Sequence, residues 1–166
     1  MRRLAALGLS AAVLSAAALG ACAPGAPEGV RKAVLDQAVS DAIGDPGTCV
    51  LIADQGKVVY QYGTHVVCGR TLPTCEGPGV QSLDQLLKKA AGERRTASCR
   101  SNADGTRIVA WASGPIEGRE RMTFAAVMEA SEAPPGIVVA DKLASAFARA
   151  GLGPKQPSPG GEGPAA

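Results

Sequence analysis

The amino-acid sequence predicts an α+β fold, a single small domain built on a five-stranded antiparallel sheet with flanking helices. Residues 30–43 and 137–150 repeat apolar side chains with the period of an α-helix. Between them lie a shorter helical segment and five short apolar or alternating segments, which turn residues separate. The element order is therefore α-β-β-α-β-β-β-α. An antiparallel sheet with helices packed on it is the economical architecture for that order.

The first part of the chain predicts a helix followed by a β-hairpin. The apolar residues of 30–43 form one stripe, and Gly44 and Pro46 end the helix. Residues 48–53 are rich in β-branched side chains, which favours a strand. Residues 58–62 are the expected second strand. The turn D-Q-G-K before them supplies a glycine for a positive φ, so the two strands are expected to form a hairpin.

Residues 64–80 contain two cysteines among prolines and glycines, so they predict an irregular loop stapled by a disulfide. A loop of this length in a compact domain is often functional, and we expect a contact surface on it. The polar residues expected on that surface are His65, Arg70 and Glu76. Beyond the loop, Ser82 and Gln85 have the spacing of a capping box and predict a short helix that ends at Gly92.

The second half of the chain predicts three more strands and a last helix. The predicted strands are residues 96–102, 106–113 and 122–128. The turn A-D-G joins the first two, and residues 114–119 form a longer turn before the third. The third strand is apolar almost throughout, which fits a central strand covered on both faces. A loop over residues 129–136 then leads into the helix at 137–150.

The most apolar strands are the first and the last, so we expect them to be central neighbours. With the five strands numbered along the chain, the expected order is 2-1-5-4-3. The first and last helices then lie together on one face of the sheet. The closing residues, 153–166, contain mainly Gly and Pro and predict a disordered tail.

The first residues have the layout of a secretory signal peptide over residues 1–21. Two arginines precede an apolar run from Leu4 to Leu19, and small residues follow it. The ending L-G-A-C resembles the lipobox of bacterial lipoproteins. That resemblance implies that Cys22 carries lipid and becomes the first residue of the mature protein. Cleavage without lipid is an alternative, and so is a retained anchor, although the run is shorter than the about 18 residues of a membrane span.

Residues 22–29 predict a flexible tether, because Pro and Gly prevent regular structure there, and the domain extends over 30–152. In lipoproteins, sorting depends partly on the residue after the lipidated cysteine. Here that residue is Ala23, which by the same resemblance implies the outer membrane, if the cell has one. The protein would then face the periplasm. A secreted soluble protein is the alternative.

The chain has 17 Lys+Arg and 15 Asp+Glu, and the loss of Arg2 and Arg3 with the leader brings the two into balance. Interspersed charges of both signs argue against nucleic-acid binding, which needs a basic patch or stripe. The sequence also contains no C-x-x-C pair and one histidine, His65, which argues against a zinc site. We therefore expect neither metal nor cofactor.

Four cysteines remain besides Cys22, an even number that predicts two disulfides in an exported protein. Cys68 and Cys75 bracket a short segment, and a bridge between them would leave Cys49 to pair with Cys99. That second bridge conflicts with the expected strand order, because bridged Cα atoms lie only about 4.4–6.8 Å apart. A bridge from Cys49 to Cys75 or to Cys68 is the alternative.

Residues 50–60, after an apolar helix, resemble the opening hairpin of serine β-lactamases and penicillin-binding proteins. Residues 107–113 and 122–128 and the last helix resemble their closing strands and C-terminal helix. The same element order is similar to that of roadblock and profilin-like domains. The lactamase chemistry is missing, because no serine is followed three residues later by lysine and K-T-G is absent. The resemblance therefore implies a reduced, inactive relative.

The sequence thus predicts a lipid-anchored envelope protein that binds a protein or peptidoglycan partner, with no catalytic residue assigned. The alternatives are a structural component of an envelope assembly and a hydrolase with an unrecognised nucleophile, Ser101 or Ser113. That nucleophile would need His65 within hydrogen-bond reach, about 2.6–3.2 Å. Trp111 and Tyr60 are expected in the core, with a ligand groove as the alternative.

Overall fold

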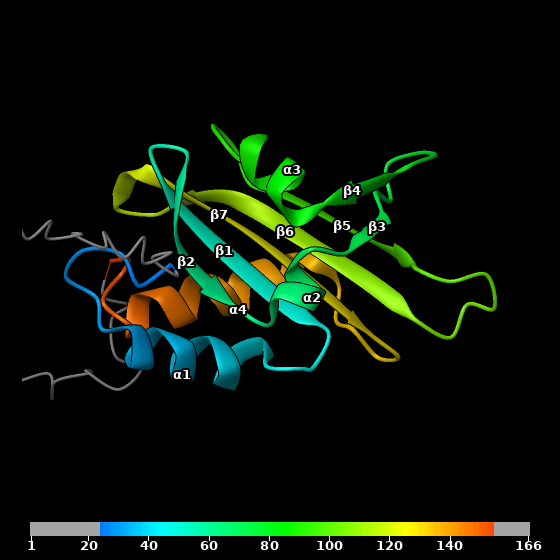
Figure 1. Cartoon of the computed structure of the whole chain (residues 1–166), viewed down its shortest axis with the longest axis horizontal. Coiled ribbons are helices and arrows are strands. Elements are labelled where there is room, and N and C mark those ends of the chain that lie inside the picture. Colours follow the sequence, from blue (N-terminus) through cyan, green and yellow to red (C-terminus); the bar gives the residue numbers. More distant parts are fainter. Residues whose placement is uncertain (1–23, 155–166) are drawn as a thin grey trace, which may run out of the picture.

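A five-stranded antiparallel sheet forms the centre of the molecule, in the order β2-β1-β7-β6-β5 (Figure 1). The computed structural model describes residues 24–154. The strands of this sheet are β1 (Thr48–Asp54), β2 (Lys57–Tyr62), β5 (Arg95–Arg100), β6 (Ile108–Ile116) and β7 (Arg119–Ala130). The predicted α+β class and the antiparallel sheet are confirmed.

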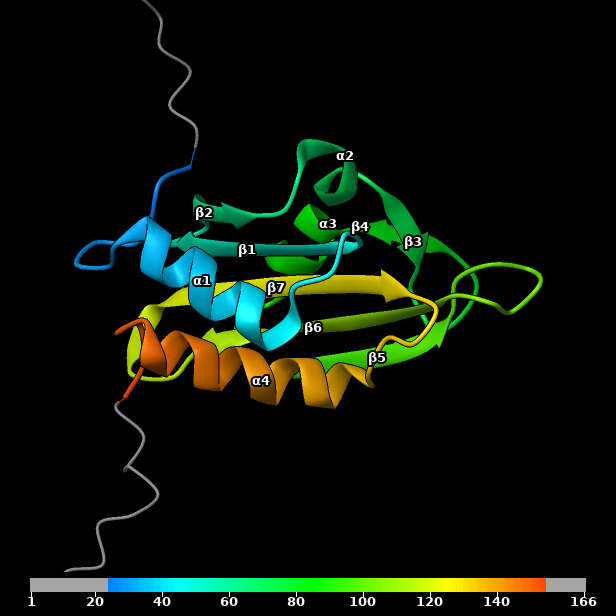
Figure 2. The same ribbon diagram turned by 90° about the horizontal axis from the view of Figure 1, so that it is seen from below.

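Two long helices, α1 (Lys32–Ile43) and α4 (Gly136–Arg149), lie side by side on one face of the sheet (Figure 2). Their periodic apolar residues are buried against the sheet, as the sequence predicts. Phe147 of α4 meets Phe124 of β7 edge to face, with ring centroids 5.4 Å apart. Tyr60 of β2 is also fully buried here, and its hydroxyl donates a hydrogen bond to Asp36 of α1 at 3.0 Å. Tyr60 is therefore a core residue and not part of a groove.

The opposite face of the sheet carries the short helix α3 (Leu83–Lys88) and the stapled loop, which we define as residues 64–82. The loop includes the one-turn helix α2 (His65–Cys68) and a small hairpin of β3 (Thr71–Pro73) and β4 (Val80–Ser82). A second, smaller apolar core lies beneath them. The capping box of Ser82 and Gln85 is present in full, so the predicted start of α3 is confirmed.

Each strand of the sheet has the neighbours that the sequence predicts. The first strand pairs with the second and with the last, and the last continues to β6 and then β5. The predicted element order is incomplete, however, because it omits α2, β3 and β4. With β3 and β4 counted in the numbering, the order across the sheet is 2-1-7-6-5 and not 2-1-5-4-3. The sequence did not predict this hairpin, because its strands have only three residues each and Pro73 and several glycines lie in or beside them.

The turn between β6 and β7 is tighter than the predicted loop over residues 114–119. β6 continues through Gly114 and Pro115, with an irregularity in register after Pro115. Gly114 has a φ of +156°, and a Cβ there would lie 2.9 Å from the Cα of Arg94. The absence of a side chain thus lets the strand pass close to the segment before β5, so a residue expected to break the strand extends it.

The two ends of the described chain lie at one end of the sheet, near the β6–β7 turn (Figure 2). Arg119 beside that turn donates a hydrogen bond to the carbonyl oxygen of Gly151. Between residues 24 and 154, no helix is long and apolar enough to cross a membrane. The predicted signal peptide, Cys22, the first tether residues and most of the predicted tail lie outside the described residues.

Candidate binding surface

Two disulfides attach the stapled loop to the sheet, one at each side. Cys68 at the end of α2 is bonded to Cys49 of β1, with a Cα–Cα distance of 5.2 Å. Cys75, after β3, is bonded to Cys99 of β5, with a Cα–Cα distance of 5.4 Å. The loop therefore spans the sheet from a central strand to an edge strand and is held covalently at both.

The expected pairs Cys68–Cys75 and Cys49–Cys99 are wrong, whereas the alternative Cys49–Cys68 is correct. The reason is the strand order, because β7 and β6 separate β1 from β5. Three strand spacings amount to about 14 Å. That exceeds the reach of a disulfide, about 6.8 Å between Cα atoms.

A polar cluster around Glu129 ties the stapled loop to the end of the sheet away from the chain ends. Glu129, near the end of β7, is 3% exposed. Its carboxylate forms ion pairs with Arg70 of the stapled loop at 2.5 Å and with Arg107 at 3.6 Å. Ser101 donates a hydrogen bond to the same carboxylate at 2.6 Å.

Burial alone raises the pKa of Glu129, because the charged form loses hydration. The Ser101 hydroxyl and the two guanidinium groups outweigh this effect, so the pKa lies below its ordinary value of 4.5. Glu129 is therefore a charged structural anchor at neutral pH and not a proton donor. Sequence reasoning missed it, although a lone acidic residue at the end of the apolar run 122–128 was the available signal.

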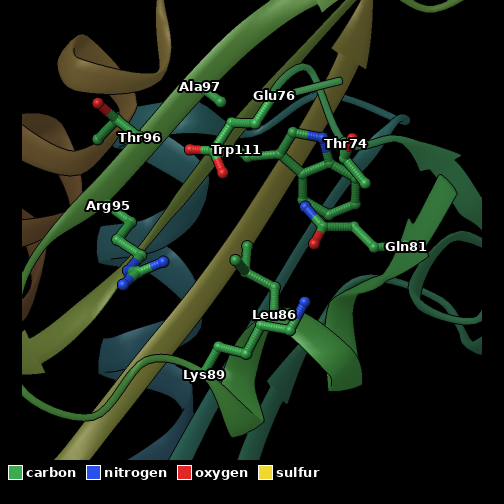
Figure 3. A pocket seen from close by; sticks show the side chains of 9 residues that line it. All are labelled: Thr74, Glu76, Gln81, Leu86, Lys89, Arg95, Thr96, Ala97 and Trp111. Atoms are coloured by element: carbon green, nitrogen blue, oxygen red, sulfur yellow. The ribbon is translucent and has the colours of Figure 1, made fainter. Parts of the chain in front are cut away.

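A small hollow of about 70 Å³ lies between the stapled loop, α3 and β5 (Figure 3). Trp111 of β6 forms part of its wall and is 2% exposed, and its indole N–H donates to the carbonyl oxygen of Pro73 at 2.7 Å. Leu86 lies beside it, and the side chains of Lys89, Arg95 and Glu76 surround the hollow (Figure 3). Trp111 is thus mainly a core residue that also forms the wall of a hollow edged by charges.

The three predicted contact residues lie on one loop but do not converge on one point. Arg70 is bound to Glu129, and Glu76 lines the Trp111 hollow. His65 is exposed at the start of α2, and within residues 24–154 its side chain has no hydrogen bond or ion pair. The loop therefore offers a contact surface made of separate features.

The serines considered as nucleophiles do not form a Ser–His pair. Ser101 donates a hydrogen bond to Glu129, and Ser113 is fully buried, with no hydrogen-bond partner for its Oγ among residues 24–154. No hydrogen bond in the described part of the chain joins His65 to either serine. The charged residues of the β6–β7 turn do not supply a buried catalytic group either, because all are exposed or partly exposed: Glu117, Arg119 and Glu120. Nothing in this geometry favours the hydrolase.

Comparison with known proteins gives no match. No family model, curated protein or solved structure matches this chain. The resemblances to bacterial lipoproteins, β-lactamases and roadblock or profilin-like domains therefore remain predictions from sequence. Within residues 24–154, no group of His, Cys, Asp or Glu is arranged to hold a metal ion.

Proposed function

We propose that the chain is a lipid-anchored protein of the bacterial cell envelope, and that its domain binds a protein partner through the face carrying the stapled loop. One observation carries this proposal above the others. The loop is fixed by a disulfide at each side, yet its outer residues remain free, with Val66 78% and Val80 63% exposed. A rigidly held loop with exposed apolar side chains is a common form of recognition surface.

The disulfides support an exported location, because such bonds persist in the periplasm and outside the cell and are rare in the reducing cytosol. The lipobox-like L-G-A-C supports anchoring at Cys22. The described chain begins two residues after that cysteine, at the end of the sheet opposite the Glu129 cluster (Figure 2). An anchor at Cys22 would therefore leave the stapled loop and the β5–β6 turn pointing away from the membrane.

The first test is the intact mass of the mature protein extracted from membranes, before and after reduction and alkylation. We expect a chain that starts at Cys22 and carries acyl groups, with four cysteines alkylated only after reduction. A soluble species without lipid would remove the anchor from the proposal. Cysteines alkylated without reduction would remove the stapled loop.

The second test is site-specific photo-crosslinking in the envelope. A photoreactive residue replaces Val66 on the stapled loop, and a matched control replaces Ala33, which is exposed on α1 on the opposite face. We expect a protein adduct from position 66 and none from position 33. Equal labelling from both positions, labelling of peptidoglycan in place of protein, or no adduct would contradict a protein-binding loop face.

A further inference from the structure

The outer edge of β5 is open. β5 is the last strand of the sheet, and no other strand of the described chain pairs with its outer side. The Ser101 N–H donates to the carbonyl oxygen of Arg107 at 2.9 Å, so these two residues form a hydrogen-bonded pair. Hydrogen-bonded pairs alternate with non-hydrogen-bonded pairs along an antiparallel ladder. The register continues this series through Cys99↔Val109 and Ala97↔Trp111.

The residues between them, Thr96, Ser98 and Arg100, therefore direct their backbone N–H and C=O groups away from β6. All three are exposed or partly exposed. Such a row of free backbone groups is a template for a further strand.

A hollow flanks this edge on each face of the sheet. On the stapled-loop face lies the Trp111 hollow, which Ala97 and Arg95 of β5 help to line. On the α4 face lies a second hollow of about 300 Å³, lined by Ser98, Arg100, Ile108, Ala133 and Pro135. Side chains of a strand alternate between the two faces. An added strand would thus direct successive side chains toward one hollow and then the other.

α4 packs on β5 and β6, and the outward-facing residues of β5 remain exposed or partly exposed. Its first residue is Gly136, where a Cβ would lie 2.8 Å from the carbonyl oxygen of Ala97. The Gly136 N–H donates to the Ser98 hydroxyl at 2.7 Å. These contacts hold β5 in place at the end of the sheet, so the edge is ordered before a partner arrives and less entropy is lost on binding.

The charges near this edge indicate which kind of segment could bind there. Residues 94–101 include Arg94, Arg95 and Arg100 and contain no acidic residue. Arg94 pairs with Asp141 and Arg95 with Glu93, but both ion pairs are exposed to solvent and therefore weak. Arg100 has no carboxylate partner within residues 24–154. Lys89, at the Trp111 hollow, has no ion-pair partner in the described part of the chain. Two copies of β5 paired antiparallel about its centre would place Arg95 of one copy near Arg100 of the other, which like-charge repulsion disfavours.

We propose that the β5 edge binds an extended, acidic segment of a partner protein, which adds to the sheet as a sixth strand and directs alternate side chains toward the two hollows. This inference rests on the proposed function, because it names the kind of partner that the envelope domain binds. Backbone hydrogen bonds would provide affinity, and the arginines and hollows would provide selectivity.

The test uses the full mature chain and random heptapeptides displayed on phage. We expect selected peptides to be rich in Asp or Glu and to have β-branched residues at alternate positions. Methylation of alternate backbone amides in a selected peptide should weaken binding by about tenfold or more along one edge of the peptide and leave the other edge unaffected. Peptides with basic sequences, or equal effects from both sets of amides, would overturn the proposal.

Variants of the chain provide the second measurement. Thr96→Pro removes an N–H that points outward, so the ladder to β6 stays intact, and Thr96→Val is the matched control that keeps this N–H. We expect Thr96→Pro to weaken the selected peptides by about tenfold and Thr96→Val to leave them unchanged. The Arg95→Glu/Arg100→Glu double variant should lose the acidic peptides. Equal binding to all variants would overturn the proposal, and the methylated peptides decide it if Thr96→Pro does not fold.

A photoreactive residue at Thr96 separates this inference from the proposed function. A protein captured from position 66 but not from position 96 would leave the proposed function standing and overturn the β5 inference. Two results together would support the β5 inference. The adduct from position 96 should lie in an acidic segment of the captured protein, and a synthetic peptide of that segment should show the same alternating effect of backbone methylation on binding. Capture of a second copy of the chain would contradict the inference.

Discussion

The two faces of the sheet are stabilised by different means. On one face, α1 and α4 cover the sheet with fully buried side chains such as Leu35, Val39, Val139 and Leu143. On the other face, six residues of α3 and the stapled loop cover a smaller core, in which Leu72, Leu86 and Leu87 remain slightly exposed. Both disulfides lie on this second side.

The difference shows where covalent bonds are needed. A helix of twelve or fourteen residues presents several apolar turns to the sheet and needs no further attachment. The strands of the β3–β4 hairpin have three residues each, and an isolated two-stranded hairpin is only marginally stable in water. The disulfides and the Arg70–Glu129 ion pair provide what the second face lacks in buried apolar area.

We expect the largest loss of stability from a substitution in the core beneath α1 and α4. Leu143→Ala removes a fully buried side chain in the middle of α4 and leaves a cavity against the sheet. We expect a loss of about 2–5 kcal/mol in the free energy of unfolding, measured by urea denaturation with the disulfides intact. Ile137→Ala, on the same helix but 50% exposed, is the control and should change stability by less than about 0.5 kcal/mol.

Leu72→Ala on the stapled loop makes the comparison of the two faces direct. Leu72 is 7% exposed, and the disulfides still hold the loop when its side chain is truncated. We therefore expect a smaller loss than that from Leu143→Ala. Equal losses at the two positions would show that the second face relies on apolar packing as much as the first.

Removal of a disulfide should release the second face alone. The Cys75→Ala/Cys99→Ala variant frees the stapled loop from β5, across a sequence separation of 24 residues. We expect a loss of about 2–4 kcal/mol in unfolding free energy. Hydrogen exchange should accelerate in the stapled loop and α3 while α1 and α4 keep their protection. Loss of protection in α4 would show that the two faces unfold as one unit.

Much of the first face could be predicted from the sequence, because it follows regular patterns. The helical period of residues 30–43 and 137–150 and the apolar run at 122–128 predict helices and a central strand, and all three are present. The order of strands followed from placing the most apolar strands in the centre. Gly114 is the exception, because its role depends on the close approach of Arg94, a contact distant in sequence.

Less of the second face could be predicted, because its structure depends on contacts between distant segments. The spacing of Cys68 and Cys75 suggested a bridge between neighbours, whereas each bonds to a strand of the sheet. Arg70 was expected on the contact surface, but its partner Glu129 lies 59 positions away, and an acidic residue at the end of an apolar run does not indicate which residue it pairs with. The β5 edge was not predicted, because whether a strand lies at an edge depends on the pairing of all the strands in the sheet.

The smallest expected effect tests the polar tie between the stapled loop and β7. Glu129→Gln keeps the shape of the side chain but removes the charge that Arg70, Arg107 and Ser101 surround. We expect a loss of about 1–3 kcal/mol in unfolding free energy at neutral pH, because hydrogen bonds to a charged group are replaced by weaker ones. Glu132→Gln, three residues later and exposed, is the matched control and should have little effect.

The pH dependence of stability gives this prediction a second readout. The folded-state pKa of Glu129 lies below the ordinary 4.5, so the unfolded chain takes up a proton more readily than the folded chain. The contribution of Glu129 is therefore fully present above the ordinary value and is lost as the pH falls from there through the folded-state pKa. Urea denaturation at a series of pH values should show a shallower acid decline for Glu129→Gln than for the wild type or Glu132→Gln. An unchanged decline would mean that Glu129 does not link the stapled loop to the sheet through its charge, and the disulfides would then be the main attachment of that face.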